Sequence, residues 1–594
     1  MLKEYPRPQF RREEWLSLNG SWEFEFDDGN VGLAEKWYQG KNFTRKIEVP
    51  YVYECELSGI GDTAPHRRFW YKKRLSLPPA WKGKRIFIHF GAIDYAAKIF
   101  VNGEIAGEHI GGNTAFDVEI TRFLDYCNDE ICVYAEDDPF DECQPRGKQF
   151  WEEKPREIWY TRSSGIWQSV FLECVNENYI KDLNVTTDID RGEATFLLHC
   201  EAAADADVRL RISLDGEEVV AGSVAVKCGS ARLTLDVFHD KIMNRSVHSN
   251  GLCWSPENPV LFDIEAELFV DGKKEDNIQS YFGMREISVE NGEIYLNHHK
   301  YFMRLVLDQG YFPGGLLTPA NDADLEEDIR IAKKMGFNGC RKHQKVECEL
   351  FHYYADKLGF LVWGEMANCA NFSPISASRF QQEWADSVLQ RINHPCIVAW
   401  VPLNESWGVP DLSNSEEQRA HALSLYYLTK MLDPFRPVIS NDGWEMVKTD
   451  IVGIHNYAHG GKDEFARQAN YEKNIATREG LLYRPTTNRN IFVGGFGDEG
   501  QPILLTEMGG ASYGKYDGRN VYGYSEVESE EEFISFLERL FKAVYASGEL
   551  KGFCYTQFSD VEQEINGLVT KDRKPKAEIE RIARAVTGDF QQMR

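Results

Sequence analysis

Two carboxylates occupy comparable places in the second half of the chain. Glu405 follows the apolar run 397–403 in the dipeptide Asn404-Glu405, and Glu507 follows the run 502–506. Two carboxyl groups that face one cleft can combine acid–base and nucleophilic chemistry, because one donates a proton while the other attacks as an anion. At a separation of about 5 Å, such a pair hydrolyses glycosidic bonds. Only the fold can bring these two together, because 102 positions (507 minus 405) separate them.

The elements that must position this pair lie between residues 286 and 594, where short apolar runs alternate with amphipathic helices. Apolar residues at helical spacing in 325–335 and capping boxes that begin at Ser415 and Ser529 indicate helices. The strand candidates are 301–307, 338–343, 360–365, 397–403, 437–440, 451–455, 502–506 and 552–556. Eight strand–helix units predict a (β/α)8 TIM barrel, whose chemistry lies at the C-terminal ends of its strands.

Polar or aromatic side chains follow every strand candidate. They are Asp308, Arg341 with His343, Glu365, Asn404 with Glu405, Trp444 after Asn441-Asp442, His455 with Tyr457, Glu507, and Gln557 with Asp560. Since the strand ends of a barrel meet at one rim, we expect these side chains to line a shared cleft and to bind substrate. For each residue alone, a paired scaffold role is the alternative. No histidine has the spacing of a metal ligand, so neither a metal nor a cofactor is expected.

The first 285 residues are rich in β-strand patterns. Period-two runs such as 21–26 and 97–101, bounded by Gly and Asn, predict a jelly-roll-like β-sandwich over 1–178. The alternation continues from 179 to 285, where two runs each end before an Asp-Gly dipeptide. A segment of about 100 residues has the size of an immunoglobulin-like sandwich.

Residues 391–406, Arg-Ile-Asn-His-Pro-Cys-Ile-Val-Ala-Trp-Val-Pro-Leu-Asn-Glu-Ser, resemble the signature of the family 2 glycoside hydrolases. In that family Asn-His-Pro precedes a strand and Asn-Glu ends it. Residues 91–95 and 163–168 resemble parts of the family's sugar-binding sandwich, and 573–576 resembles the stretch that closes its barrel. The resemblance therefore covers nearly the whole chain in the expected order.

The resemblance implies a retaining exo-glycosidase that works by double displacement, with Glu405 as acid/base and Glu507 as nucleophile. Asn404 would contact the sugar 2-hydroxyl, Arg341 would keep Glu507 charged, and Tyr457 would donate to its oxygen. These roles require unequal environments, because the acid must hold a proton near neutral pH while the nucleophile stays ionised. Trp444 is expected to stack on an apolar sugar face, with a core position as the alternative.

Three places concern the identity of the sugar. Many family members carry Arg-Gly-x-Asn-x-His after the first barrel strand, whereas this chain differs over 304–311. Glucuronidases of the family hold the uronate carboxylate with an Asn-x-Lys element, but Asn566-Gly567-Leu568 lacks the Lys, which disfavours a glucuronide. Lys342 and Lys345 flank the second strand end and would suit a galacturonide carboxylate, or they are solvated loop lysines.

We therefore expect β-galactosidase-like activity on terminal β-D-galactosyl residues, including α-L-arabinopyranosides, because this activity is common in the resembled family. A β-galacturonidase or β-glucuronidase is the alternative among enzymes, followed by a β-mannosidase. A non-catalytic carbohydrate-binding protein is the alternative from another class. The presence of both Glu405 and Glu507 argues against it.

Bulk properties narrow the partners and the location. The net charge of -27 disfavours nucleic acid and anionic membranes as partners, and no apolar run approaches the roughly 20 residues that span a bilayer. The first residues lack a secretory signal core and the thirteen cysteines are scattered, so a cytoplasmic protein without a disulfide framework is expected. A homodimer is one possible assembly. Residues 457–498 are predicted to form a long loop that deepens the cleft.

Overall fold

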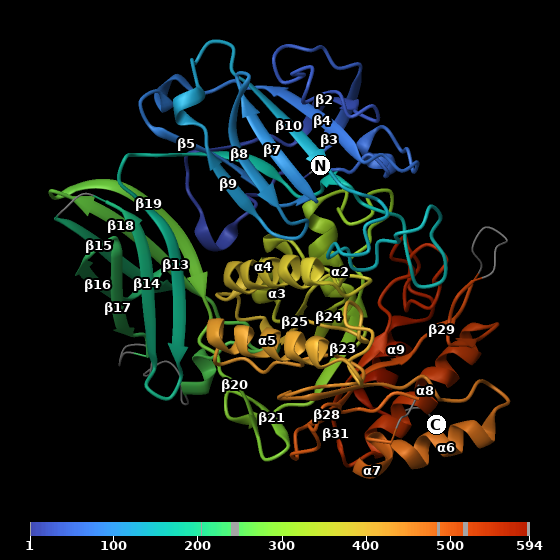
Figure 1. Ribbon diagram of the computed structural model, residues 1–594. Coiled ribbons are helices and arrows are strands. Elements are labelled where there is room, and N and C mark those ends of the chain that lie inside the picture. The colour runs from blue at the N-terminus through green and yellow to red at the C-terminus, as the bar shows by residue number, and fades with distance from the viewer. Residues whose placement is uncertain (1, 203–204, 239–248, 484–487, 515–520, 591–594) are drawn as a thin grey trace.

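The computed structural model describes residues 2–202, 205–238, 249–483, 488–514 and 521–590. Two β-sandwiches precede a barrel along the chain (Figure 1), coloured blue, green, and yellow to red. The predicted order of jelly-roll-like sandwich, immunoglobulin-like sandwich and TIM barrel is confirmed.

The first sandwich packs a six-stranded sheet against a four-stranded sheet. In spatial order the larger sheet contains β3 (Arg45–Val49), β2 (Gly20–Phe26), β4 (Arg68–Arg74), β10 (Glu130–Glu136), β7 (Ala96–Val101) and β8 (Glu104–Ile110), and the smaller contains β1 (Trp15–Ser17), β12 (Val170–Val175), β5 (Arg85–Phe90) and β9 (Phe116–Glu119). A short pair, β6 (Ile93–Asp94) and β11 (Gly165–Ile166), lies beside them. Asn102 and Gly103 have φ values of 50° and 81°, which the tight turn between β7 and β8 requires.

The second sandwich is antiparallel throughout. Its sheets contain β13 (Tyr179–Asp188), β14 (Glu193–Glu201) and β17 (Ser230–Asp236), and β16 (Glu217–Ala225), β15 (Ala206–Leu214), β18 (Phe262–Val270) and β19 (Lys273–Phe282). In β18 every second residue from Phe262 to Leu268 is buried, because one face of the strand packs on the core. Asp271 and Gly272, both with positive φ, form the predicted turn after it.

A small sheet of β20 (Ile287–Glu290), β21 (Glu293–Leu296) and β22 (His299–Lys300) leads into the barrel. The barrel strands are parallel, in the order β26 (Ile397–Val401), β25 (Leu361–Glu365), β24 (Gly339–Lys342), β23 (Met303–Asp308), β31 (Leu550–Thr556), β28 (Ile503–Gly509) and β27 (Val452–His455). These seven strands confirm seven of the eight strand candidates. Two further short strands, β29 (Ala511–Ser512) and β30 (Ser525–Glu526), pair after β28.

The predicted strand 437–440 is not a regular strand. It follows β26 through hydrogen bonds such as Ile439 N to Trp400 O (3.0 Å), and the residues just after it are joined to β27 by a bridge between Gly443 and Ile454. Gly443 has φ +104°, and a Cβ there would lie 2.8 Å from Nδ1 of His455. The segment therefore closes the barrel but leaves the regular ladder where the backbone must pass beside His455.

Helices surround the barrel, and they comprise α2 (Asp322–Lys334), α3 (Glu349–Leu358), α4 (Pro374–Arg391), α5 (Glu416–Leu432), α6 (Phe465–Ile475), α7 (Arg478–Leu481), α8 (Glu530–Ala546) and α9 (Ile579–Thr587). Ser415 and Ser529 cap α5 and α8 as predicted, since each accepts a hydrogen bond from the third residue of its helix. The reciprocal half of each predicted capping box is not formed, because Gln418 and Glu532 accept from Asp411 N and Glu528 N instead. The prediction of one long loop over 457–498 is wrong: α6 and α7 lie within it, while 484–487 lie outside the described residues.

Two further observations concern the whole described chain. No helix in it is long and apolar enough to cross a membrane. The thirteen cysteines are all free thiols.

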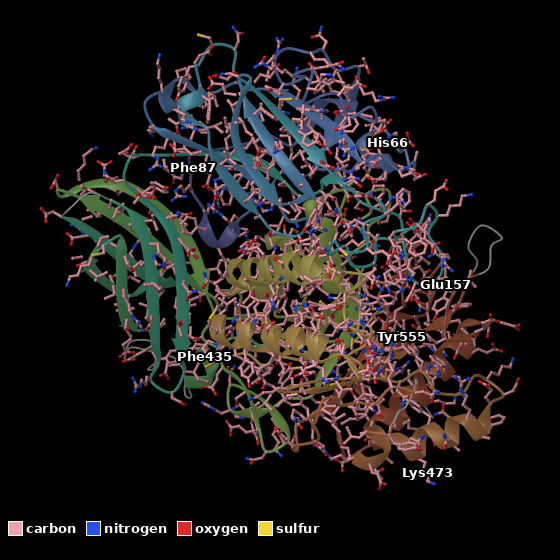
Figure 2. All side chains as sticks on the ribbon, in the orientation of Figure 1. His66, Phe87, Glu157, Phe435, Lys473 and Tyr555 are labelled. Atoms are coloured by element: carbon pink, nitrogen blue, oxygen red, sulfur yellow. The ribbon has the colours of Figure 1, made fainter. Side chains whose placement is uncertain are left out.

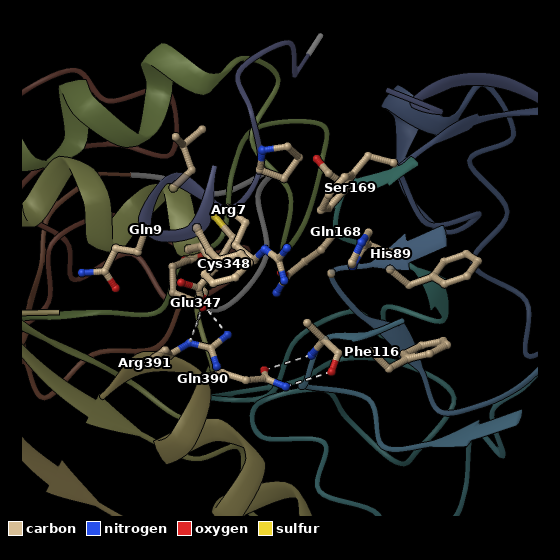
Figure 3. A pocket seen from close by; sticks show the side chains of 18 of the residues that line it. Arg7, Gln9, His89, Phe116, Gln168, Ser169, Glu347, Cys348, Gln390 and Arg391 are labelled. Atoms are coloured by element: carbon tan, nitrogen blue, oxygen red, sulfur yellow. Dashed lines mark hydrogen bonds and ion pairs between the residues drawn. The ribbon is translucent and has the colours of Figure 1, made fainter. Parts of the chain in front are cut away.

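A cavity of about 370 Å³ lies where the two sandwiches meet the barrel (Figure 3). Arg7 and His89 from the first sandwich and Arg391 from the barrel are among its lining residues. At its edge Gln390 donates to Ala115 O (2.8 Å) and accepts from Ala115 N (3.1 Å), which joins α4 to the first sandwich. Neither predicted catalytic glutamate lines this cavity, so it is an inter-domain junction apart from the barrel mouth.

Candidate active site

The barrel brings Glu405 and Glu507 into one site, as their strand positions predict. One oxygen of each carboxylate and one ring nitrogen of His455 all lie within 4.8 Å of one another. Nδ1 of His455 is 2.7 Å from Glu405 Oε1 and 3.5 Å from Glu507 Oε2. This approach fits the roughly 5 Å between carboxyl groups that direct nucleophilic attack on a sugar requires, and not the wider spacing that leaves room for a water.

Arg341, at the end of β24, is the central cation of the site. Its side chain is fully buried, and Nε lies 2.5 Å from Glu365 Oε2 while Nη1 lies 2.7 Å from Asp442 Oδ2 and 3.2 Å from Glu507 Oε1. Nη2 donates to Asn404 Oδ1 (2.5 Å). Burial disfavours the charge, but the carboxylates, Asp442 first, raise the pKa of Arg341 well above its usual range. A permanent guanidinium therefore fixes four polar neighbours at once.

Glu507 receives a second donor from Tyr457. The phenol donates to Glu507 Oε2 (2.6 Å) and also lies 2.9 Å from Thr556 Oγ1. Its ring stacks on Tyr524 with centroids 3.4 Å apart and 6° between planes. Burial and the neighbouring Glu507 raise the pKa of Tyr457 well above its usual value, so the hydroxyl keeps its proton and acts as a donor.

Glu405 has a different environment from Glu507. Its side chain is 20% exposed, against 7% for Glu507. Its backbone has φ 50°, an unusual conformation for a glutamate, and its N–H donates to Asp442 O (2.9 Å). The geometry turns the Glu405 carboxylate toward the barrel mouth, where it meets His455.

The pKa values of Glu405 and His455 depend on each other. Burial by itself raises the pKa of Glu405, but the hydrogen bond and charge of His455 outweigh it and hold that pKa below its ordinary value. Burial alone lowers the pKa of His455, yet the negative charges of Glu507, Asp442 and Glu405 raise it to about 10. Both shifts favour a charged pair of Glu405 and His455, whose facing atoms are 2.7 Å apart.

Asp442 was not among the predicted substrate-binding residues, although it follows the segment 437–440. Besides its pairing with Arg341, Oδ1 accepts from Thr506 Oγ1 (2.7 Å). Burial raises the pKa of Asp442, but Arg341 and His455 outweigh burial and lower it to about 2. A Cβ on Gly453 would lie only 1.8 Å from Asp442 Oδ1, so the carboxylate occupies space that glycine leaves open.

Three other predicted residues also lie in this cluster. Nδ1 of His343 is 3.1 Å from both Glu365 Oε1 and Arg341 Nη2. The Trp444 ring meets the His455 ring edge-on, with centroids 5.6 Å apart. Since Asn404 accepts from Arg341 through its oxygen, its side-chain NH₂ is the group it can offer to a sugar hydroxyl.

Asp308 and the two flanking lysines form a separate buried cluster. Lys342 Nζ lies 2.7 Å from Asp308 Oδ2 and 2.9 Å from Glu347 Oε2, and Lys345 Nζ lies 2.8 Å from Glu347 Oε2. Both lysines are less than 5% exposed, so the expectation of solvated loop lysines is wrong. Since carboxylates of the chain already neutralise them, neither offers a free cation to a substrate carboxylate.

The residues after the last strand also bond within the protein. Asp560 Oδ1 accepts from Lys576 Nζ (2.7 Å), and Gln557 donates to Asn566 Oδ1 (2.7 Å). Burial raises the pKa of Asp560 to about 6 although Lys576 opposes it. Gln557 Oε1 is buried and has no hydrogen-bond partner among the described residues, so this oxygen is available to accept a hydrogen bond.

A segment of the first sandwich completes the barrel mouth, and no strand-end argument predicts it. Gly147 N donates to Asn368 O (3.0 Å) beyond β25, and Tyr160 donates to the carboxylate of Glu564 beyond β31. The Trp159 ring meets Trp407 edge-on, with centroids 4.7 Å apart, two residues after Glu405. Aromatic rings from two domains therefore flank the acid pair.

The same segment forms one wall of a groove beside the mouth. Figure 2 shows Glu157 next to the red C-terminal part of the barrel, where Gln563 donates to Glu157 O (2.7 Å). Trp159 O also accepts from Gln563 (2.9 Å). Tyr160 and Tyr522 line the groove from opposite domains. The only signal in the sequence was the density of aromatic residues in 150–160.

Two sandwiches, a TIM barrel and an acid pair at two strand ends together define a multidomain enzyme class that acts on glycosides. The chain belongs to family 2 of the glycosyl hydrolases. The family's sugar-binding domain matches residues 15–173, the following family domain matches 178–285, and its TIM barrel domain matches 287–588.

Known relatives carry two activities in their names. A beta-galactosidase of Thermoanaerobacter pseudethanolicus is 26% identical over 69% of this chain, which spans 53% of that protein. A beta-glucuronidase of Streptococcus agalactiae is 26% identical over 94% of each chain. The β-glucuronidase of Ruminococcus gnavus in complex with uronic deoxynojirimycin superposes with a TM-score of 0.77 over 98% of this chain and 99% of its own, at 19% identity. The chain spans about half the length of some curated relatives and nearly all of others.

Proposed function

We propose that this protein is a retaining exo-β-glycosidase. In the first step Glu507 attacks the anomeric carbon while Glu405 protonates the departing oxygen, which breaks the glycosidic bond and forms a glycosyl ester on Glu507. In the second step Glu405 takes a proton from water, the water oxygen bonds to the same carbon, and Glu507 leaves as a carboxylate. The observation that carries the proposal is the approach of the two carboxylates to within 4.8 Å.

The unequal surroundings of the two glutamates support this division of roles. Glu507 is deep in the site and is held by Arg341 at 3.2 Å and by Tyr457 at 2.6 Å, as a nucleophile that must be aimed at one carbon requires. Glu405 is the more exposed of the two, as a group that exchanges protons with a leaving group and with water requires. His455 can supply a proton to Glu405 across 2.7 Å.

For the sugar, we infer a β-D-uronide rather than the neutral β-galactoside expected from the sequence. The S. agalactiae beta-glucuronidase matches this chain over nearly its full length, and the R. gnavus structure that shares its fold is that of a β-glucuronidase. A β-D-galactoside is the second candidate, supported by the 26% identity to the T. pseudethanolicus beta-galactosidase.

A panel of nitrophenyl glycosides tests the reaction and the sugar together. It comprises the β-D-glucuronide, β-D-galacturonide, β-D-galactoside, β-D-mannoside and α-L-arabinopyranoside. We expect the highest kcat/KM on a uronide, with the β-anomer as the first product by NMR. A higher value on the galactoside contradicts the proposed sugar, and saturable binding without hydrolysis of any glycoside contradicts the enzyme.

Chemical rescue tests the role of Glu507. Glu507→Ala should abolish turnover and should regain it with azide, which attacks the open face and gives a glycosyl azide of inverted configuration. Wild-type protein with azide provides the control, because its nucleophile already occupies that face. Unchanged activity of Glu507→Ala without azide contradicts the assignment.

A further inference from the structure

We propose that Lys148, which belongs to the first sandwich, binds the carboxylate of the uronide in the barrel mouth. This inference rests on the proposed function and adds the residue that selects the substrate. It assigns to a loop of the sugar-binding sandwich the cation that Asn566-Gly567-Leu568 lacks.

Lys148 is a buried residue whose ammonium makes no ion pair with the described residues. Only 6% of the residue is exposed, and Nζ lies 5.2 Å and 5.8 Å from the ring centroids of Trp159 and Tyr160. Among the described residues, no carboxylate oxygen lies within 4.0 Å of it. The comparably buried Lys342 and Lys345 each have a carboxylate within 2.9 Å. Since the ammonium makes no ion pair with the described residues, it is available to an incoming anion.

The ammonium lies near the catalytic site, because the Trp159 ring that it approaches at 5.2 Å meets Trp407, two residues after Glu405, at 4.7 Å. Burial raises the pKa of Glu405, while His455 and then the charge of Lys148 lower it. Burial and Arg341 lower the pKa of His343, and Lys148 adds to their effect. A ligand carboxylate beside Lys148 would therefore lie in the same mouth as the acid pair.

The backbone around Lys148 is held in place from both sides. Gly147 has φ +59°, and a Cβ there would lie 2.2 Å from Gln344 O, so the loop approaches the barrel more closely than a side chain permits. Lys148 O accepts from Tyr160 N (3.0 Å). A cation placed in advance binds its ligand without the cost of ordering a mobile loop.

Glu564 is the acidic group of the mouth that a uronate would also meet. Its carboxylate accepts from the Tyr160 hydroxyl and from Asn566 Nδ2 (3.0 Å), so both oxygens are occupied by other donors. Burial raises the pKa of Glu564, and Lys148 is the strongest influence that opposes it. Glu564 thus orients the Tyr160 side of the loop and leaves the Lys148 ammonium for the ligand.

The test compares charged and neutral substrates that differ only at the carboxylate. Wild-type, Lys148→Met and Lys148→Arg proteins are assayed on nitrophenyl β-D-glucuronide against the β-D-glucoside, and on the β-D-galacturonide against the β-D-galactoside. Lys148→Met should lower kcat/KM on the better uronide about 100-fold, which is about 2.7 kcal/mol at 1.36 kcal/mol per tenfold. On the matching neutral glycoside the change should stay below about 3-fold, while Lys148→Arg should retain the preference for the uronide.

Two controls separate a binding role from a structural role. Lys154→Met removes an exposed lysine of the same loop and should change neither substrate. In thermal unfolding, free glucuronate or galacturonate should raise the Tm of the wild type and not that of Lys148→Met. The variant itself should be close to wild type in stability, because methionine keeps an apolar stem of similar length and no ion pair among the described residues is lost.

The outcomes distinguish the two proposals. A wild type that hydrolyses only neutral glycosides overturns the uronide and the Lys148 assignment together. Uronide hydrolysis that survives in Lys148→Met, or an equal loss on charged and neutral substrates, overturns the Lys148 assignment alone. Equal stabilisation of both proteins by the free uronate also contradicts it.

Discussion

Tyr457→Phe removes a single hydroxyl from the proposed nucleophile. The phenol donates to Glu507 Oε2 at 2.6 Å, and its ring is held by stacking on Tyr524 at 3.4 Å, so the ring should keep its place. In the second chemical step Glu507 leaves the sugar and regains its negative charge, which this hydrogen bond stabilises. A hydrogen bond to a charged group contributes about 1.5–3 kcal/mol, which corresponds to roughly 10- to 150-fold in rate.

The loss should therefore appear in breakdown of the glycosyl enzyme. With a dinitrophenyl glycoside of the preferred sugar, kcat should fall by about this factor and KM should fall with it, because the intermediate accumulates. Stopped-flow measurement should show a burst of one equivalent of phenol before the slow steady state. Tyr471→Phe is a matched control, because that buried hydroxyl on α6 has no partner among the described residues. An unchanged kcat in Tyr457→Phe, or an equal loss in Tyr471→Phe, refutes the reasoning.

Three further predictions follow from the same contacts. Glu405→Ala should leave kcat/KM nearly unchanged for substrates with good leaving groups and lower it by a factor of at least about 100 for substrates with poor ones. A plot of kcat/KM against leaving-group pKa would show the difference. Gly147→Ala, whose Cβ would lie 2.2 Å from Gln344 O, should lower both Tm and uronide preference, and an unchanged preference would exclude the loop from selectivity. Glu54 has its pKa raised to about 8 by burial, so folded protein binds the extra proton and stability falls as pH rises from about 4 to 8. Glu54→Gln should remove that loss, and a Tm difference from wild type that stays constant from pH 5 to 8 would contradict it.

Much of the architecture could be predicted because local patterns determine it. Period-two alternation predicts β15 and β18, and the Asp-Gly dipeptides that follow them adopt the positive φ values of tight turns. Hydroxyl caps predict the starts of α5 and α8. Each of these signals depends on residues within one element, so no knowledge of distant contacts is needed.

The acid pair was predictable only in part from local sequence patterns. Glu405 and Glu507 each end an apolar strand, and the barrel rule then places both at one rim. The separation within 4.8 Å, and the position of His455 between the two carboxylates, required the assembled barrel. The proton that the sequence led us to expect on Glu405 depends on charges from other strands, so no local pattern could indicate it.

Side-chain direction and contacts between distant parts of the chain decided which charged groups pair. Successive residues of β24 point to opposite faces, so Arg341 enters the barrel mouth while Lys342 packs over the Phe351 ring of α3 at 4.2 Å and pairs with Asp308. The sequence by itself determined the three domains, the strand ends and the two glutamates that follow them. Only the tertiary structure decided which buried charges neutralise one another and that Lys148, from another domain, makes no ion pair within the described part of the chain, because a counter-ion is chosen by proximity in space and not along the chain.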